Sequence, residues 1–159
     1  MVKFDLYRFI DKMDIEDVTL KNRGDYNVLD SGEWISPDLA HAAMGEDFKY
    51  DRASFQSSSD PSTRVAKLVW MEKGRTDARA VGKVSTISGD GVKGKTEVYD
   101  TNSSYSEGDE LTIAVINDGT DNAGKIGFKP ASSGDIVKAI CIREPNHDSE
   151  GLLHFELKC

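Results

Sequence analysis

The pattern closest to a known chemical motif lies at Gly89–Thr96, which reads GDGVKGKT and matches GxxxxGK[ST] at every required position. In such a loop, backbone amides surround the phosphates, the lysine reaches the β and γ oxygens, and the hydroxyl holds magnesium. The loop must open a helix, because the helix N-terminus supplies the anion site. The following residues, EVYDTNSS, instead indicate a strand and then a turn. We therefore predict a glycine-rich hairpin and strongly disfavour a nucleotide-binding protein.

The other reactive side chains do not form a convergent pattern. His147, Asp148 and Ser149 are adjacent, whereas a nucleophile, base and orienting acid normally converge from separate positions. His154 lies in the run LLHFEL, which predicts a strand with this side chain facing outward. Cys141 lies in an apolar run typical of a buried, inert thiol. We predict no catalytic residues, no metal and no cofactor, and hence a protein that is not an enzyme.

Composition excludes several classes of partner. The chain of 159 residues has 28 acidic and 20 basic residues, which gives a formal net charge of −8. Nucleic acid or an anionic membrane surface would require a basic face, so neither is expected as a partner. The sequence has no apolar run long enough to span a bilayer, and Asp5, Arg8, Asp11 and Lys12 interrupt any secretory signal pattern.

The elements that would position functional residues differ between the two parts of the chain. Leu6, Phe9, Ile10 and Met13 follow helical spacing and predict a short amphipathic helix. Ser36 as N-cap and Pro37 at the first helical position predict a second helix over 38–44. The polar segment SSSDPS at 57–62 predicts a boundary. We therefore divide the chain into an N-terminal arm at 1–60 and a β-rich body at 61–159 that folds without it.

The body is predicted to be mainly β, with glycine-rich turns between short strands and no intervening helices. This pattern favours a small antiparallel β-barrel or β-sandwich. Asn117–Asn122 is expected to be a hairpin connection. The predicted strands are Val65–Met71, Ala80–Ile87, Val92–Tyr99, Leu111–Ile116, Lys125–Phe128, Ile136–Ile142 and Leu152–Leu157.

A succession of phrases in the body resembles the capsid decoration (cement, or head-stabilising) proteins of tailed bacteriophages, over roughly residues 64 to 157. The phrases are Val69-Trp70, Asp77–Val84, Tyr99–Thr101, Tyr105, Glu107–Ile113, Lys129–Val137 and Gly151–Leu157. The resemblance implies a β-tulip-like body that sits as a homotrimer on the outer capsid surface of the virion. It also implies an arm that bridges capsomers, the major capsid protein as partner, synthesis in the host cytoplasm, and no catalytic residues.

If the arm locks capsomers together, its apolar side chains are the candidate anchors, because buried aromatic residues dominate interface energies. The alternative is that these side chains pack on the β body of their own chain. A second function class also stays open, a carbohydrate- or protein-binding β module on a virion. The candidate capsid or subunit-interface anchors are Phe4, Leu6, Phe9, Ile10, Trp34, Phe48 and Phe55.

Overall fold

The computed structural model describes residues 3–8, 14–22, 24, 28–39, 48–70 and 82–158. It is mainly β, with 41% of residues in strands and 8% in helical segments, which confirms the predicted fold class. In these residues, eleven strands form one continuous sheet, and the five strands at one end of its order close into a ring. Within these residues, no helix has the length and apolar character needed to cross a bilayer.

Five strands close into a small barrel in the order β3-β4-β2-β6-β5, because β5 pairs again with β3. Only β2 and β4 are parallel. Alternate residues face the barrel interior, as the period of a strand requires, and form one apolar cluster with Val18, Ile35 and Val84 at its centre. The barrel strands are β2 (Asp14–Leu20), β3 (Trp34–Pro37), β4 (Lys49–Asp51), β5 (Lys67–Val69) and β6 (Lys83–Ser88).

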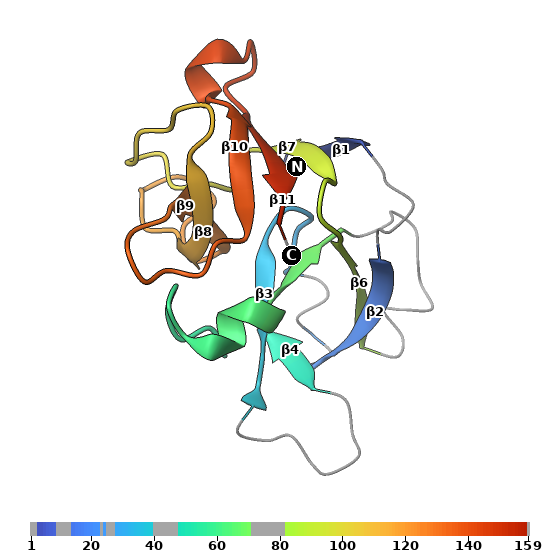
Figure 1. The fold of residues 1–159 in the computed structure, drawn as a ribbon. Coiled ribbons are helices and arrows are strands. Elements are labelled where there is room, and N and C mark those ends of the chain that lie inside the picture. Colours follow the sequence, from blue (N-terminus) through green and yellow to red (C-terminus); the bar gives the residue numbers. More distant parts are fainter. Residues whose placement is uncertain are drawn as a thin grey trace.

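The remaining strands continue the same sheet from β3 in the order β9-β8-β10-β11-β7-β1. We call this part, outside the barrel, the second sheet. A parallel bridge between Tyr99 and Phe128 brings the segment after β7 back to β9, so this sheet also curls. In Figure 1 this sheet occupies the upper half of the molecule and the barrel the lower half. The second-sheet strands are β1 (Phe4–Arg8), β7 (Lys93–Thr96), β8 (Glu110–Val115), β9 (Ile126–Pro130), β10 (Ala139–Arg143) and β11 (Leu153–Leu157).

A larger core joins the barrel to the second sheet. Trp34 faces out of the barrel and packs edge-on against Phe128 with 5.8 Å between ring centroids, and Phe128 in turn contacts Phe155. Lys138 is also buried here and donates to the carbonyl oxygen of Arg64, in the 3-10 helix η3 (Pro61–Val65), at 3.0 Å. Its ammonium group lies 5.1 Å from the Trp34 ring. A second 3-10 helix, η4 (Pro145–His147), follows β10.

The first sixty residues supply four strands to the eleven-stranded sheet, β1, β2, β3 and β4. β1 pairs with β7, β3 with β9 and β2 with β6, so strands from before residue 60 are hydrogen-bonded to strands from after it at several places. The predicted helix from Leu6 to Met13 is wrong over 6–8, which belong to strand β1, and its remainder at 9–13 lies outside the described residues. Ser36 and Pro37 end β3 rather than cap a helix, and 40–47 also lie outside the described residues.

Candidate functional site

The structure places most of the candidate anchors inside the molecule. Trp34 and Leu6 belong to the larger core, and Phe4 and Phe55 are partly buried against it. Phe48 is 38% exposed, directly before β4. Phe9 and Ile10 lie outside the described residues. Of the described anchors, therefore, Phe48 is the one that offers substantial apolar surface to a partner.

The Gly89–Thr96 segment opens a strand and not a helix, which agrees with the sequence-based rejection of a phosphate loop. It is not a hairpin, however, because β6 pairs with β2 and β5, whereas β7 pairs with β1 and β11. The segment instead links the barrel to the second sheet. Gly94 lies where β1 and the Phe155 ring approach the backbone, since a Cβ there would come within 2.8 Å of Leu6 and Phe155 atoms.

The two lysines of this segment line a pocket on the outer face of the second sheet. Lys93 and Lys95 are half-buried and alternate with the buried Gly94 and Thr96, so both side chains face outward. The pocket has a cavity volume of about 480 Å³. Strands β1, β7, β10 and β11 supply its lining, which consists of Asp5, Tyr7, Lys93, Lys95, Ile142, Arg143 and His154.

A chain of hydrogen bonds crosses the edge of this pocket. The Nε2 atom of His154 lies 2.8 Å from Oδ1 of Asp148, and its Nδ1 atom lies 3.3 Å from the hydroxyl oxygen of Tyr7. Because the Asp148 carboxylate can only accept, Nε2 of His154 donates to it, and the Tyr7 hydroxyl contacts the other ring nitrogen, Nδ1. Burial raises the pKa of the Tyr7 phenol. Burial therefore keeps the Tyr7 phenol protonated, and the contact with His154 fixes its position at the edge of the pocket.

The Asp148 carboxylate is fixed by its own turn. Backbone N–H groups of Leu152 and Glu150 donate to Oδ2 at 3.0 Å each. These bonds, with that from His154, lower the pKa of Asp148 to about 2, the Leu152 bond having the largest effect. The pairing of Asp148 with His154 was not predicted from the sequence, because Asp148 was weighed only with its neighbours His147 and Ser149 as a catalytic group. The sequence feature that could have predicted this contact is the position of Asp148 and His154 on either side of a turn at Gly151.

The pocket is positive in an acidic protein. Among the residues the structure describes, Lys93, Lys95 and Arg143 form no ion pair. Asp5 is the one carboxylate in the lining. Glu156, which faces the neighbourhood of Tyr7, lies 3.1 Å from the ammonium group of Lys158. The pocket can therefore bind an anion, and its donors are charged amines, a guanidinium group and a phenol.

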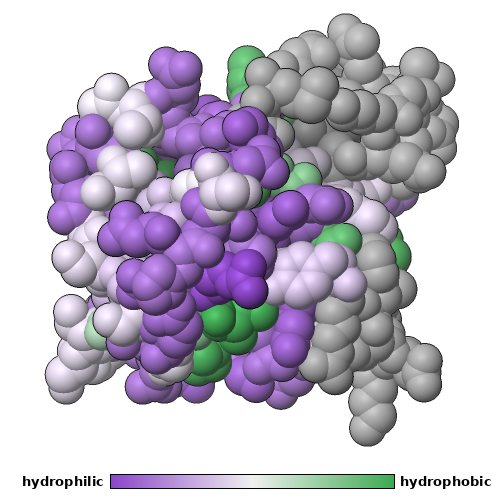
Figure 2. All heavy atoms as spheres, turned by 90° about the horizontal axis from the view of Figure 1, so that it is seen from above, coloured by the Kyte–Doolittle hydropathy of each residue, from purple (hydrophilic) through white to green (hydrophobic). Residues whose placement is uncertain are grey.

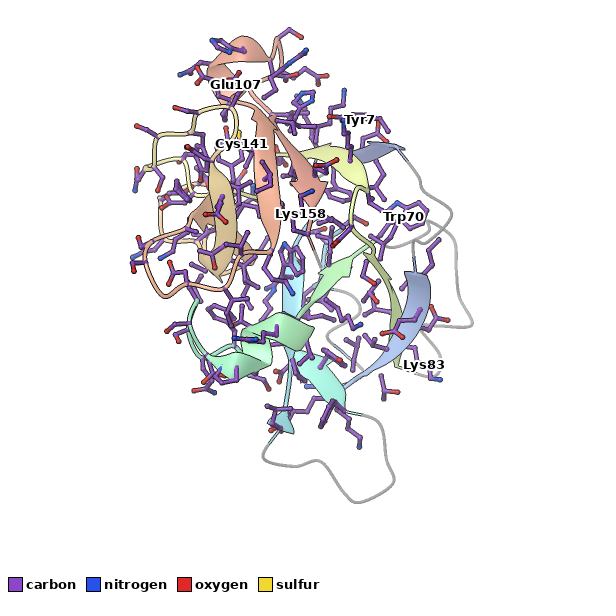
Figure 3. All side chains as sticks on the ribbon, in the orientation of Figure 1. Tyr7, Trp70, Lys83, Glu107, Cys141 and Lys158 are labelled. Carbon is purple, nitrogen blue, oxygen red and sulfur yellow. The ribbon has the colours of Figure 1, made fainter. Side chains whose placement is uncertain are left out.

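A second polar cluster lies beside η4, near the top of Figure 3 where Glu107 is labelled. Nδ1 of His147 lies 2.7 Å from Glu107 Oε1, and its Nε2 lies 3.2 Å from Glu144 Oε1. Both partners accept, so the imidazole needs both of its protons to keep both contacts. Glu107, and then Glu144, accordingly raise the pKa of His147. The three side chains lie close enough for a metal, but both ring nitrogens of His147 are already engaged with the two carboxylates, and we call this arrangement the His147 clamp.

A buried thiol and a pair of tyrosine hydroxyl groups are already occupied by the protein's own structure. Cys141 is fully buried, as predicted, and burial raises the pKa of its thiol to about 11, so it is unreactive at neutral pH. The Tyr99 and Tyr105 rings line a separate hollow next to Pro145. Their hydroxyl groups donate inward, to the carbonyl oxygens of Gly151 at 2.7 Å and Asp100 at 2.8 Å. These phenols therefore stabilise the loops that carry them.

Comparisons with known proteins do not add a relative to this description. A scan against protein-family models, a search of curated proteins and a search of solved structures each find no match to the chain.

Proposed function

We propose that this protein is a non-catalytic capsid decoration protein, which binds the outer surface of a tailed-phage head and stabilises it by bridging capsomers. The observation that carries the proposal is the run of phrases that resembles this family. Three of these phrases overlap β8, the end of β9 and β11, which are strands of a single sheet. Two other phrases reach the barrel, at Val69 on β5 and at Lys83 and Val84 on β6. The mainly β character of the chain is what the resemblance implies.

The surface of the chain is compatible with a position on the outside of a head. The formal net charge is −8, which opposes contact with packaged DNA. The face seen in Figure 2 is mainly hydrophilic, with small hydrophobic areas among the described residues. Such a surface suits exposure to solvent over most of its area and apolar contact over a limited patch.

Exposed apolar side chains favour the barrel end as the capsid-binding part. Five of the seven large hydrophobic side chains that are exposed in the described residues lie within the first sixty residues. Ile15 on β2 is 48% exposed and Phe48, before β4, is 38% exposed. Because β2 and β4 are neighbours in the barrel, we assign the capsid contact to the barrel and keep Phe48 as its candidate anchor.

The test is sedimentation of the purified protein with empty heads assembled from the major capsid protein of the same genome. The wild-type protein should sediment with the heads, and an Ile15→Ser, Phe48→Ser double variant should not. Val115→Ser is the matched control, because Val115 is 53% exposed on β8 in the second sheet, and it should bind normally. Absence of wild-type binding would overturn the proposal, and binding by the double variant would overturn the placement of the contact.

The predicted homotrimer has a separate test. Light scattering on a sizing column should give a mass near three times 17.5 kDa when the protein is concentrated. A monomer at every concentration would contradict self-association in solution and would leave the capsid to template the trimer.

A carbohydrate- or protein-binding module is the second candidate, and the Tyr99–Tyr105 hollow is the observation that favours it. The hollow combines these rings with neutral polar groups from Thr101, Ser103 and Asn146, a lining that suits a sugar. Glycan binding by the isolated protein, lost in a Tyr99→Ala variant, would favour this candidate over a capsid role.

A further inference from the structure

The outer pocket of the second sheet has features of a built site that the proposed capsid contact does not use. It lies on strands β1, β7, β10 and β11, whereas the assigned capsid contact lies on β2 and next to β4. In Figure 3 Tyr7 marks the pocket at the upper right, and Lys83 marks the barrel at the lower right. The two surfaces can therefore be tested independently.

Two β-bulges flank the pocket, one on each side. The β1–β7 register shifts between Leu6 and Arg8, which leaves Tyr7 as the extra residue. The β10–β11 register shifts between Cys141 and Arg143, which leaves Ile142 as the extra residue. Bulges redirect side chains and are enriched next to functional sites. Here both extra residues line the pocket, and the second bulge puts Arg143 opposite His154.

The cations converge from both sides of β11. Lys95 of β7 and Arg143 of β10 each lie opposite His154 in the register. Adjacent strands are about 4.8 Å apart, so the two backbones are separated by roughly 10 Å. Long side chains from both sides can meet over His154 and hold a group of a few ångströms between them. Lys93 adds a third positive charge from the same face of β7.

Electrostatics favour an anion with more than one charge. Three cations repel each other in this concave pocket, and Asp5, opposite Lys95 in the register, is the only carboxylate of its described lining, which leaves a net charge of about +2. Glu156 lies opposite Lys93 in the register but is paired with Lys158. An oxyanion relieves this repulsion and accepts the charge-assisted hydrogen bonds that lysine and arginine donate. Asp148 already fixes His154, whose Nδ1 atom contacts the Tyr7 hydroxyl, so both rings are preorganised at the edge of the pocket.

We propose that the pocket formed by Lys93, Lys95 and Arg143 over His154 and Tyr7 binds a divalent oxyanion, the phosphate or sulfate type of group. The ligand accepts from Lys95 and Arg143 on opposite sides, and Lys93 adds electrostatic attraction. The proposal does not depend on the capsid role, since it rests on the charges, the bulges and the hydrogen-bond chain of this face.

The test is an NMR titration of the full-length protein with sodium phosphate and sodium sulfate, at constant ionic strength set with sodium chloride. The ring signals of Tyr7 and His154 should shift in a saturable way with either dianion. Sodium acetate should cause no saturable shift, because its single charge does not balance the excess of the three cations over Asp5 in the described lining. Saturable shifts with acetate of equal affinity, or shifts that chloride reproduces, would overturn the proposal.

Variants separate specific binding from general attraction. Lys95→Gln and Arg143→Gln should each weaken phosphate affinity at least about tenfold, with the dispersion of the amide spectrum unchanged because both side chains are at least partly exposed. Lys83→Gln is the matched control, since Lys83 is an exposed strand lysine on the barrel, and it should leave affinity unchanged. Equal weakening in all three variants would mean a non-specific effect of net charge and would overturn the site.

Discussion

At the residue scale, buried charge is the feature that most constrains this protein. The carboxylate of Glu33 is fully buried and accepts from both Nε and Nη2 of Arg52. It also accepts from the backbone N–H of Asp30 at 2.7 Å. Arg52 also donates to the Val28 carbonyl oxygen at 2.8 Å. This one pair therefore ties the loop before β3 to the segment after β4. Its loss would remove a fully buried carboxylate from the half-buried guanidinium group of Arg52.

We predict that Glu33→Ala lowers the free energy of unfolding by about 2–3 kcal/mol, because several charge-assisted hydrogen bonds disappear together. Urea denaturation followed by tryptophan fluorescence measures the change. Glu150→Ala is the control, since Glu150 forms an exposed ion pair with Lys3, and it should change stability by less than about 0.5 kcal/mol. Equal stabilities of the two variants would show that the Glu33 clamp contributes little.

The His147 clamp predicts a specific pH dependence. The His147 pKa is raised above its usual 6.5, chiefly by Glu107, and the bond from His147 lowers the Glu107 pKa below its usual 4.5. The imidazolium therefore adds stability that is fully present below pH 6.5 and is lost as the pH rises through its raised folded pKa. The carboxylate adds stability that is present above pH 4.5 and is lost as the pH falls through its lowered folded pKa.

An NMR pH titration of the His147 ring tests this clamp. Glu107→Gln should move the midpoint of that titration back toward 6.5, because the main partner of the imidazolium is neutralised. Glu150→Gln should leave the midpoint unchanged. A His147 midpoint at or below 6.5 in the wild-type protein would contradict the clamp.

At the element scale, the close approach of β1 to β7 explains the glycine in the middle of β7. A Cβ at Gly94 would lie 2.8 Å from the Asp5 carbonyl oxygen and equally close to the Leu6 and Phe155 side chains. We predict that Gly94→Ala destabilises the protein by about 1–3 kcal/mol, through displacement of β1. Thermal unfolding measures the effect.

Gly24→Ala is the control for that substitution, because the nearest atom to its Cβ is an Asn22 oxygen at 3.6 Å. It should be close to neutral. A neutral Gly94→Ala would mean that β1 does not pack on β7 as described.

The sequence predicted the strands after residue 60 better than those before it. Each of the seven predicted strands has a counterpart in the structure, since short apolar runs between glycine-rich turns mark them. β3 was not recognised, because its residues WISP are all buried and lack the alternation of a half-buried strand. Leu6 and its neighbours fit a helical period by coincidence, and the pairing with β7 decides their conformation.

The candidate site was only partly accessible from the sequence. Lys93 and Lys95 lie in the segment that matches a nucleotide-binding motif, and in the structure both line the outer pocket of the second sheet instead. The Asp148–His154 contact depends on a turn that Asp148 itself stabilises through the Leu152 and Glu150 amides. Arg143 and Tyr7 reach the pocket through register shifts. Such shifts follow from tertiary pairing and leave no local pattern to read.

At the scale of the whole molecule, the barrel depends on strands from the first sixty residues. β2, β3 and β4 belong to the closed ring, and β1 is hydrogen-bonded to β7 at the edge of the second sheet. Removal of residues 1–55 would delete these four strands and expose the apolar residues that they cover. We predict that this truncated chain lacks cooperative unfolding and near-ultraviolet circular dichroism. A well-folded truncated chain would instead support a separable arm and an independent body.

The capsid role is tested most directly by electron cryomicroscopy of heads prepared with and without this protein. A difference map should contain added density on the outer surface, at junctions between capsomers and in groups of three. The barrel, with Ile15 and Phe48, should face the shell. Identical maps, or added density confined to the inside of the shell, would contradict the account.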